Sequence, residues 1–418
     1  MNVMAHAGDN STQAYNVERL RGDFPILAEK VYDKPLVYLD NVASAQKPRQ
    51  VIDAMDDCMA HYYSNVHRGN HRLSQLSTRA YEEAREKIAK FLNASSDKEI
   101  VFTRGGTEAI NLVASSYGRA FLSEGDEVIV TEMEHHANIV PWQLLRAEKG
   151  IVLKVVPVDD AGNFLMDKFE ELLTPKTKLV AITHISNVLG TVVPVKDVIR
   201  KAHAVGAKVL LDGCQAVPHT KVDVQELGVD FYVFSGHKLY GPTGIGILWG
   251  PEELLNSMPP YQGGGDMIDR VTFAETTFQP TPHRFEAGTP AIVEAVGFGA
   301  AIDYVESIGL DNIHAHEMGL LHYATERLRT IEGLHIVGEA DEKASIISFV
   351  MDDAHISDIG TIIDRMGVAV RVGHHCAQPL MDRFGIPGTA RASFGLYNTK
   401  AEIDALYDAL VVVKEMFS

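Results

Sequence analysis

The sequence predicts an α/β protein in which a large domain with a mainly parallel sheet is followed by a smaller α+β domain. Between residues 99 and 249, short apolar runs alternate with amphipathic segments. The runs are EIVFT, DEVIVT, LKVVPV, KLVAITH, AKVLLD, DFYVFS and GIGILW. Strands that alternate with helical segments such as VKDVIRKAHAVG are typical of a parallel sheet covered by helices on both faces. We therefore expect a seven-stranded sheet.

The domain organisation follows from a change of pattern near Ala287. From about Gly297 onward the chain has longer helical stretches, two strand-like runs (SIISFVM and GVAVRV) and a final helix. A chain of 418 residues is also longer than one small core requires. We predict an N-terminal segment over residues 1–32 that packs on the small domain, a large domain over 33–296 and a small C-terminal domain over 297–418.

Composition narrows the class of protein. Hydrophobic residues at 46% and charged residues at 22% are typical of a soluble globular chain. The net charge of −18 argues against nucleic acid or an anionic membrane as a partner, since both are polyanions. The N-terminus lacks the pattern of a secretory or transit peptide. The three cysteines are too scattered for a disulfide framework. We expect a cytoplasmic protein without a membrane span.

Polar residues follow several of the predicted strands. Ligands bind beyond the carboxyl ends of the strands in an open parallel sheet, so these positions predict a site. They are Gly105, Gly106 and Thr107 after EIVF, His135 and His136 after DEVIV, Asn187 after KLVAITH, Asp212 and Gln215 after AKVLL, and Ser235, His237 and Lys238 after DFYVF. The segment Gly105–Thr107 opens a helix whose free N–H groups are suited to a phosphate, although a plain helix cap has the same pattern.

Lys238 is the most informative of these residues. It follows an apolar run, and burial favours the neutral, nucleophilic form of a lysine. The alternative is a lysine that packs its stem at the strand end and keeps its ammonium in water. Asp212 as a helix cap and His135 as a core histidine are similar alternatives. Together, however, a lysine, a carboxylate, an imidazole and a phosphate site are what a pyridoxal phosphate enzyme requires.

A second group of reactive residues lies in the stretch RVGHHCAQPLMDRFGIPGTARASF. Arg371 and two histidines give Cys376 a basic neighbourhood, which favours a reactive thiolate. The alternatives are an inert packed cysteine and a metal site built from His374, His375 and Cys376. Adjacent ligands suit zinc poorly, so we predict no metal. Arg391 has a planar fork suited to a substrate carboxylate, with an ordinary salt bridge as the alternative.

From VYLDNVASAQKP to RASFGLYN the chain resembles the class V, fold type I pyridoxal phosphate enzymes. Within them it is similar to the group II cysteine desulfurases of the SufS type. The motifs that carry the resemblance are NVHRGNH, MEHHANIVPW, ITHISNVLGT, SGHKLYGPTGIGIL, RFEAGTP and RVGHHCAQPLM. The resemblance implies a fold type I transferase that works as a homodimer with pyridoxal 5'-phosphate as its cofactor.

The resemblance also implies a role for each matched residue. Lys238 would hold the cofactor as a Schiff base, His135 would stack on its ring and Asp212 would pair with the ring nitrogen. The other implied roles are contact with the phenolic oxygen for Gln215, phosphate binding for Gly106, Thr107, Ser235 and His237, binding of the neighbouring subunit's phosphate for Thr289, substrate binding for Asn187 (also beside the cofactor), Arg371 and Arg391, and a place at the substrate entrance for His67 and Arg68.

The implied reaction converts L-cysteine into L-alanine. Lys238, once displaced by the substrate, would move the Cα proton, with the cofactor ring as electron sink. The Cys376 thiolate would then attack the substrate sulfur, a step that needs a soft nucleophile. A persulfide on Cys376 must be handed on, so the expected partner is a sulfur acceptor protein of the SufE or SufU type that feeds iron–sulfur cluster assembly.

Two positions depart from the family pattern near the cofactor. Gly106 stands where such enzymes commonly have a second threonine, which removes one hydroxyl from the phosphate site. In the motif DGCQA, Cys214 stands where alanine is usual, beside the aspartate, Asp212, that would meet the ring. We interpret Cys214 first as a small buried residue and second as a redox group.

Three other functions compete with a cysteine desulfurase. A selenocysteine lyase acting on L-selenocysteine has the same motifs. An aminotransferase or kynureninase has no need of Cys376, and a non-catalytic scaffold has no need of either Cys376 or Lys238. The presence of both residues therefore favours the desulfurase or the lyase.

Overall fold

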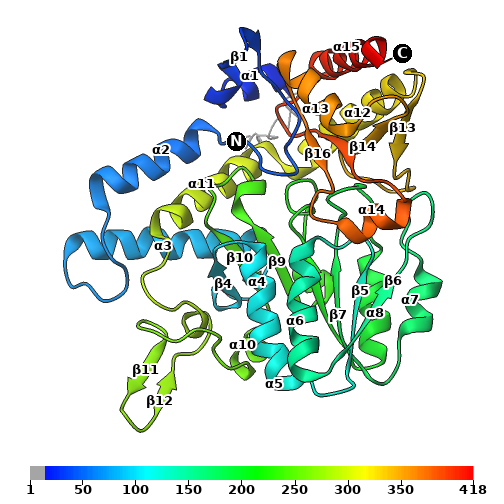
Figure 1. The fold of residues 1–418 in the computed structure, drawn as a ribbon. Coiled ribbons are helices and arrows are strands. Elements are labelled where there is room, and N and C mark those ends of the chain that lie inside the picture. The colour runs from blue at the N-terminus through cyan, green and yellow to red at the C-terminus, as the bar shows by residue number, and fades with distance from the viewer. Residues whose placement is uncertain (1–14, 418) are drawn as a thin grey trace, which may run out of the picture.

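The computed structural model describes residues 15–417 and is organised around two sheets, each with its own helices (Figure 1). The large sheet has the spatial order β4–β10–β9–β8–β7–β5–β6. Its strands are β4 (Ile100–Thr103), β5 (Glu127–Thr131), β6 (Val152–Val156), β7 (Thr177–Thr183), β8 (Lys208–Asp212), β9 (Phe231–Ser235) and β10 (Gly246–Trp249). β10 runs antiparallel to both of its neighbours, β4 and β9, and the other strand pairs in this sheet are parallel. The predicted mainly parallel, seven-stranded sheet is confirmed.

The large sheet is buried on both faces, which explains why its strands are continuous apolar runs. In β9, Phe231 and Val233 pack into one hydrophobic cluster, whereas Tyr232 and Phe234 pack into another on the opposite face. The helices α4 (Gly106–Val113), α6 (Val140–Lys149) and α10 (Glu252–Ser257) cover the first face. The second face is covered by α3 (Arg72–Phe91), α7 (Met166–Leu172), α8 (Val195–Ala204) and α11 (Ile292–Ile308).

The small sheet is antiparallel and has the order β13–β14–β17–β16. Its strands are β13 (Leu334–Val337), β14 (Ile346–Met351), β16 (Arg371–Gly373) and β17 (Thr389–Ser393). The helices α12 (Leu310–Leu328), α13 (Ile356–Arg365) and α15 (Lys400–Phe417) pack on it through a separate hydrophobic cluster. The run SIISFVM forms β14. The run GVAVRV is divided between β15 (Val368–Ala369) and β16, and β13 and β17 are additions to the predicted strands.

Segments near the N-terminus contact the small sheet and its helices. The strand β3 (Val37–Tyr38) pairs in parallel with β15. The Arg21 guanidinium donates to the Tyr397 carbonyl over 2.7 Å. Residues 1–14 of the predicted N-terminal segment lie outside the described residues. The predicted boundary between residues 296 and 297 falls inside α11, and the division at 32 and 296 stays a prediction.

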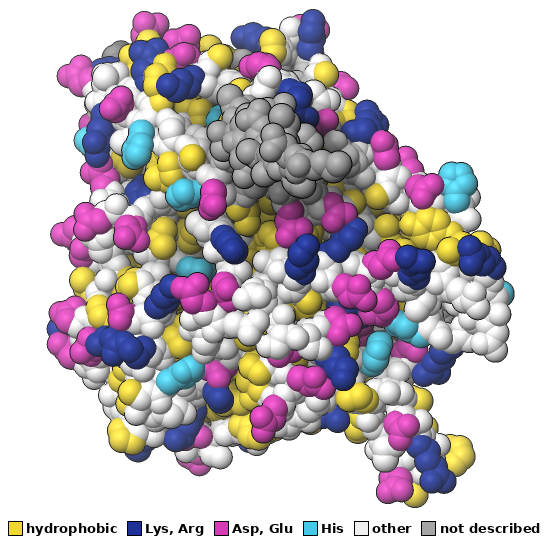
Figure 2. Space-filling view, turned by 180° about the vertical axis from the view of Figure 1, so that it is seen from behind, with side chains coloured by type: hydrophobic (Ala, Val, Ile, Leu, Met, Phe, Trp, Pro, Cys, Tyr) yellow, Lys and Arg dark blue, Asp and Glu magenta, His cyan; other side chains and the backbone are white. Residues whose placement is uncertain are grey.

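The remaining elements are short or lie at the edges of the molecule. They are α1 (Val17–Arg21), α2 (Arg49–Asp57), α5 (Arg119–Phe121), α9 (Val224–Leu227), α14 (Gln378–Phe384), the β1–β2 pair (Lys30–Val31 and Lys34–Pro35) and the hairpin of β11 (Ile268–Val271) and β12 (Thr276–Phe278). The hairpin projects from the large domain (Figure 1). On the face in Figure 2, acidic and basic side chains are interspersed. Between residues 15 and 417, none of the helices has the length and hydropathy of a membrane span.

Candidate functional site

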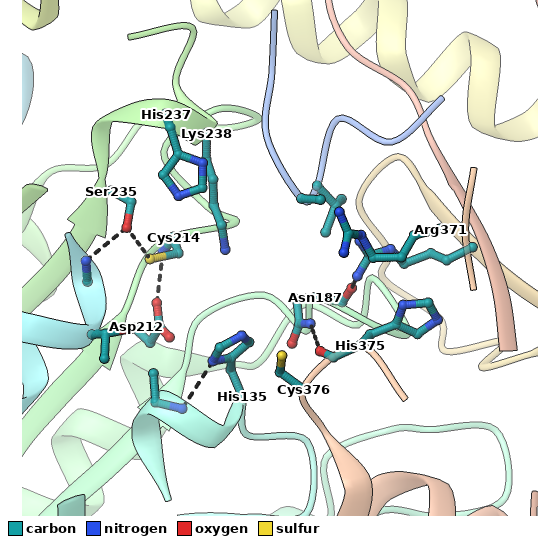
Figure 3. Close-up of a pocket in the computed structure, with 16 residues that line it drawn as sticks. His135, Asn187, Asp212, Cys214, Ser235, His237, Lys238, Arg371, His375 and Cys376 are labelled. Carbon is teal, nitrogen blue, oxygen red and sulfur yellow. Dashed lines mark hydrogen bonds between the residues drawn. The ribbon is translucent and has the colours of Figure 1, made fainter. Parts of the chain in front are cut away.

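A cavity of about 250 Å³ lies where the carboxyl ends of the large-sheet strands face the small domain (Figure 3). Most of the side chains predicted from the sequence line it. They are Gly106, Thr107, His135, Asn187, Asp212, Ser235, His237, Lys238, Arg371, Cys376 and Arg391, together with Val42, Ala43, Ala137, Cys214 and His375. The structure therefore brings the strand-end residues and the cysteine stretch into one site, although they are far apart in the chain.

One corner of the cavity is suited to an anion. The helix α4 begins at Gly106, whose N–H donates to the Ser235 hydroxyl oxygen over 2.8 Å. The His237 Nδ1 atom is buried and has no hydrogen-bond partner among the described residues. An unpartnered buried polar atom beside a helix N-terminus is what a bound phosphate would satisfy. Thr107 lies in the same lining, and the donors together fit the phosphate of the expected cofactor.

The turn after β9 carries Lys238 into the cavity. Ser235 is the last residue of the strand, and Gly236 starts a single 3-10 turn that ends at Lys238. A Cβ atom at Gly236 would lie 2.8 Å from the Ile245 side chain, so this tight turn requires glycine. Asp212 ends the neighbouring strand β8, and its Oδ1 atom accepts the Cys214 N–H over 3.0 Å. The Lys238 amine and the Asp212 carboxylate therefore lie at the ends of adjacent strands. This arrangement fits the aldehyde and the ring nitrogen of the expected cofactor.

The His135 ring forms the side of the cavity opposite Lys238 (Figure 3). Burial, and then the positive charge of Lys238, lowers the pKa of His135 to about 4. Its Nδ1 atom accepts the Ala137 N–H over 3.1 Å, which fixes the ring. The preceding residue, Glu134, is fully buried, and that burial raises its pKa to about 8. His135 is thus a neutral, oriented imidazole, the form that stacks on an aromatic ring.

Cys376 lies on the loop between β16 and α14 and is exposed. The backbone of His375 and Cys376 is left-handed, with φ of 52° and 57°. The Cys376 carbonyl accepts the His136 N–H over 2.6 Å, and the Cys376 N–H donates to the His374 Nδ1 atom over 3.1 Å. These bonds satisfy the backbone and leave the thiol directed toward the cavity (Figure 3). The loop therefore presents an accessible sulfur to whatever the cavity holds.

Arg391 is the buried cation of the small-domain side. It is 2% exposed, and burial lowers its pKa to about 10, although nearby Asp40 opposes the shift. Its Nη1 atom donates to the Asn187 carbonyl over 2.7 Å, and the Asn187 amide donates to the His375 carbonyl over 2.9 Å. The Arg391 Nε atom has no partner among the described residues. A buried guanidinium with a free N–H is suited to a carboxylate.

Asp40 is a site residue that the sequence analysis did not identify. Its carboxylate accepts from Arg371 over 3.0 Å and from Arg391 over 3.4 Å, so it holds both arginines at the cavity. These partners are more than 300 residues away along the chain. The only local signal is its position after the short apolar run VYL.

Four of the residues to which the resemblance assigns a role lie outside this cavity. Gln215 is buried beside it and donates to the Val42 carbonyl over 2.9 Å. Thr289 lines a separate hollow with Glu286 and Gly288. The other two pair with acidic groups, His67 with Glu82 and Asp266, and Arg68 with Asp266.

Metal binding has no support from the donor arrangement. Within residues 15–417, no group of three or more His, Cys, Asp and Glu side chains is placed to hold a metal ion. The His375 Nε2 atom bonds to the Thr389 hydroxyl over 2.9 Å, which commits one of the three candidate ligands to a protein contact.

Known proteins share this fold and much of this sequence. The chain is 52% identical over 402 residues to a probable cysteine desulfurase of Halalkalibacterium halodurans, covering 96% of this chain and 99% of that one. It is also 52% identical to a probable cysteine desulfurase of Mycobacterium leprae. It spans 59 to 66% of the length of that relative and of two others.

Solved structures agree with these relatives. A crystal structure of the cysteine desulfurase CsdA from Escherichia coli has a TM-score of 0.90 at 39% identity, covering 97% of this chain and all of that one. The predicted fold type I architecture is confirmed by this likeness. The family model for class-V aminotransferases matches residues 37–406, nearly the whole described chain. The chain therefore belongs to the class-V aminotransferase family.

Proposed function

We propose that this protein is a pyridoxal phosphate-dependent cysteine desulfurase that converts L-cysteine into L-alanine and collects the sulfur as a persulfide on Cys376. The observation that carries the proposal is the shared cavity of Lys238 and Cys376. A lysine at a strand end with an anion corner, a carboxylate and a neutral imidazole favours the cofactor. An exposed thiol on the opposite side favours sulfur transfer. The named relatives support the same reaction.

The strand-end residues bind and orient the reacting groups. When bound, pyridoxal phosphate supplies an electron sink that acidifies the substrate Cα–H. With the cofactor present, the Lys238 amine would hold it covalently and would move the Cα proton of the substrate. The Asp212 carboxylate keeps the ring nitrogen protonated. His135 fixes the plane of the ring, and Thr107, Ser235 and His237 hold the phosphate.

The small-domain residues act on the substrate. Arg391, with one unpartnered N–H, binds the cysteine carboxylate, and Asn187 orients Arg391 through its carbonyl. The Cys376 thiolate attacks the substrate sulfur. The new S–S bond forms as the Cβ–S bond breaks, and the electron pair of that bond stays on carbon, which takes a proton to give alanine. The enzyme thiol becomes a persulfide, so no outside oxidant or reductant is needed.

The persulfide requires a recipient outside the chain. The exposure of Cys376 supports transfer to a sulfur acceptor protein of the SufE or SufU type, which feeds iron–sulfur cluster assembly in the cytoplasm. The enzyme works as a homodimer. The position of Thr289 in a hollow separate from the Lys238 cavity supports a contact with the phosphate of a second subunit. His67 and Arg68, which both pair with Asp266, line the substrate entrance.

The test measures alanine formed from L-cysteine by the full chain with pyridoxal phosphate and a reductant. We expect Lys238→Ala and Cys376→Ser each to lower the rate by at least about 1,000-fold, because each removes a group that forms a covalent bond in the reaction. Mass spectrometry of the Cys376 peptide should show one added sulfur atom in the wild type only.

The matched controls keep the cavity unchanged. Lys90→Ala removes an exposed helix lysine and Cys58→Ala removes a buried core thiol, and both should keep most of the activity. If Cys376→Ser makes alanine at the wild-type rate, the thiol is not the nucleophile and the desulfurase proposal fails. Turnover of L-selenocysteine alone by that variant would identify a selenocysteine lyase instead.

A further inference from the structure

The two residues that depart from the family pattern, Gly106 and Cys214, touch each other in the fold. A Cβ atom at Gly106 would lie only 2.8 Å from the Cys214 sulfur and 3.3 Å from the Ser235 hydroxyl oxygen. A carbon and a sulfur cannot approach that closely without displacement, since packed atoms sit about 3.5–4.0 Å apart. The Cys214 sulfur therefore fills the volume that a side chain at position 106 would occupy.

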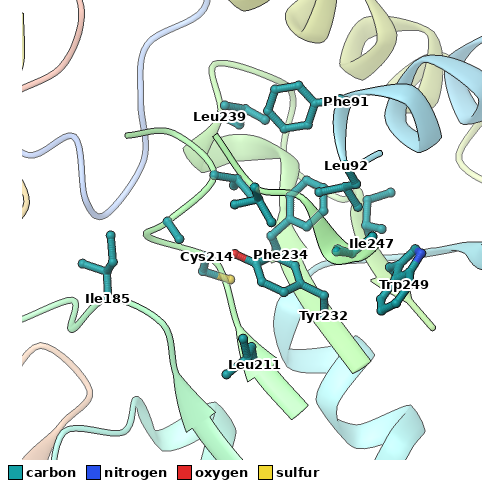
Figure 4. Packing of buried hydrophobic residues seen from close by; sticks show 14 of the residues in the cluster. Phe91, Leu92, Ile185, Leu211, Cys214, Tyr232, Phe234, Leu239, Ile247 and Trp249 are labelled. Carbon is teal, nitrogen blue, oxygen red and sulfur yellow. The ribbon is translucent and has the colours of Figure 1, made fainter. Parts of the chain in front are cut away.

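Cys214 is connected to the anion corner as well as packed against it. Its sulfur lies 3.7 Å from the Ser235 hydroxyl oxygen, within hydrogen-bond range for sulfur, and that oxygen accepts the Gly106 N–H over 2.8 Å. Its backbone N–H donates to Asp212. In Figure 4 it lies at the edge of the core beside Tyr232 and Phe234. One residue thus contacts the groups proposed for both ends of the cofactor.

A neutral Cys214 thiol can donate to the Ser235 hydroxyl oxygen, whereas a thiolate could only accept from it. Burial, and then the negative charge of Asp212, raises the pKa of this thiol to about 12. The thiol is neutral at physiological pH and carries an S–H proton. It is therefore a weak donor and a poor nucleophile, which favours the interpretation of Cys214 as a small buried residue over that of a redox group.

We propose that Cys214 is a positioning residue that aims the Ser235 hydroxyl at the cofactor phosphate. A hydroxyl oxygen has two lone pairs and one proton. If Gly106 N–H and Cys214 S–H occupy the lone pairs, the remaining O–H proton can only be donated into the cavity. The inference rests on the proposed function, because the phosphate is that of the cofactor. Cys214 thereby substitutes for the hydroxyl that is missing at position 106.

The test compares two ligands that differ only in the phosphate. The full chain, stripped of cofactor, is titrated with pyridoxal phosphate and with pyridoxal, and binding is followed by absorbance. Cys214→Ala should weaken pyridoxal phosphate binding by about 3- to 10-fold, the worth of one modest hydrogen bond, and leave pyridoxal binding within about 2-fold. Cys214→Ser keeps a donor and should recover most of the loss.

A second pair of variants tests the shared volume. Gly106→Ala should weaken pyridoxal phosphate binding by more than about 10-fold when Cys214 is present, because the new methyl displaces the sulfur. In the Cys214→Ala background the same change should cost less than about 3-fold, since the space is then open. Thermal unfolding of the cofactor-free variants separates loss of binding from loss of fold.

The outcomes distinguish the two proposals. A wild type that binds neither ligand overturns the proposed function and this inference together. A wild type that binds pyridoxal phosphate, with a Cys214→Ala variant that loses affinity for both ligands equally, overturns only the inference and makes Cys214 a packing residue. Additive effects of Gly106→Ala and Cys214→Ala on pyridoxal phosphate binding would also overturn the inference. If Gly106→Ala does not fold, the inference is still tested by the ratio of the affinities of Cys214→Ala for pyridoxal phosphate and for pyridoxal.

Discussion

The two sides of the cavity are built on different principles. On the strand-end side, Asp212 and Ser235 are the last residues of buried strands, and His135 is held neutral by burial. On the loop side, Cys376 is exposed and stands on left-handed backbone that backbone and histidine contacts hold in place. The side proposed to bind the cofactor is therefore fixed by the core of the sheet, whereas the proposed nucleophile depends on a few local bonds and stays within reach of another protein.

Beyond the two residues that form covalent bonds, a large loss of activity is expected on the strand-end side, from Asp212→Asn. Asparagine is isosteric and can still accept the Cys214 N–H, but it has no charge to keep a ring nitrogen protonated. We expect alanine formation to fall by at least about 100-fold, the usual cost of losing a preorganised electrostatic contact. Absorbance of the bound cofactor shows whether the site is still loaded. A variant with more than a tenth of the wild-type rate would contradict the role of this carboxylate.

A smaller effect is expected on the loop side, from Arg391→Lys. Lysine keeps the charge but loses the fork that reaches the Asn187 carbonyl and Asp40. The KM for L-cysteine should rise by about 10- to 100-fold, because the lysine would leave the buried Asn187 carbonyl and Asp40 without the hydrogen bonds that Arg391 donates. Arg327→Lys, which changes a surface pair with Asp404, is the matched control. The KM values are measured by steady-state kinetics. An equal KM for both variants would contradict a contact between Arg391 and the substrate.

The bonds that hold the cysteine loop can be weakened without touching the cofactor. The His136 Nε2 atom accepts the Gln378 N–H over 3.1 Å at the start of α14. Burial, with the nearby His374, lowers the pKa of His136, so its ring stays neutral and able to accept. His136→Ala should slow persulfide formation on Cys376 by about 3- to 10-fold. Surface His335→Ala is the control. An equal loss of pyridoxal phosphate affinity would show that the two sides are not independent.

The smallest effect is on thermal stability at mildly acid pH. Burial lowers the pKa of His135 and His237 to about 4 and that of His375 to about 3. The unfolded chain takes up these protons near pH 6.5, before the folded chain does. The free energy of unfolding should therefore fall as the pH drops below about 6.5 and level off, for these groups, near pH 3, the lowest of the three folded-state pKa values. A Tm several degrees lower at pH 5 than at pH 7 is expected, and an unchanged Tm contradicts it.

The sequence predicted the strand-end side well because each residue there follows an apolar run that can be recognised as a buried strand. It predicted the small domain less completely. The strand β17 reads TARAS, whose small side chains give no hydrophobic pattern, and its place is set by pairing with β14. Asp40 was not predicted because its role depends on contacts with Arg371 and Arg391, which are distant in the chain. The family likeness identified Thr289 and His67, but no local pattern could place them outside the cavity.

The burial of the three cysteines differs in a way that is useful at the bench. Cys58 and Cys214 are buried, and Cys376 is exposed. A folded chain should therefore consume one equivalent of an alkylating reagent quickly and the other two only as it unfolds. The fast equivalent counts competent chains in a preparation. It also gives a single attachment point for a fluorophore, placed where an incoming acceptor would have to dock.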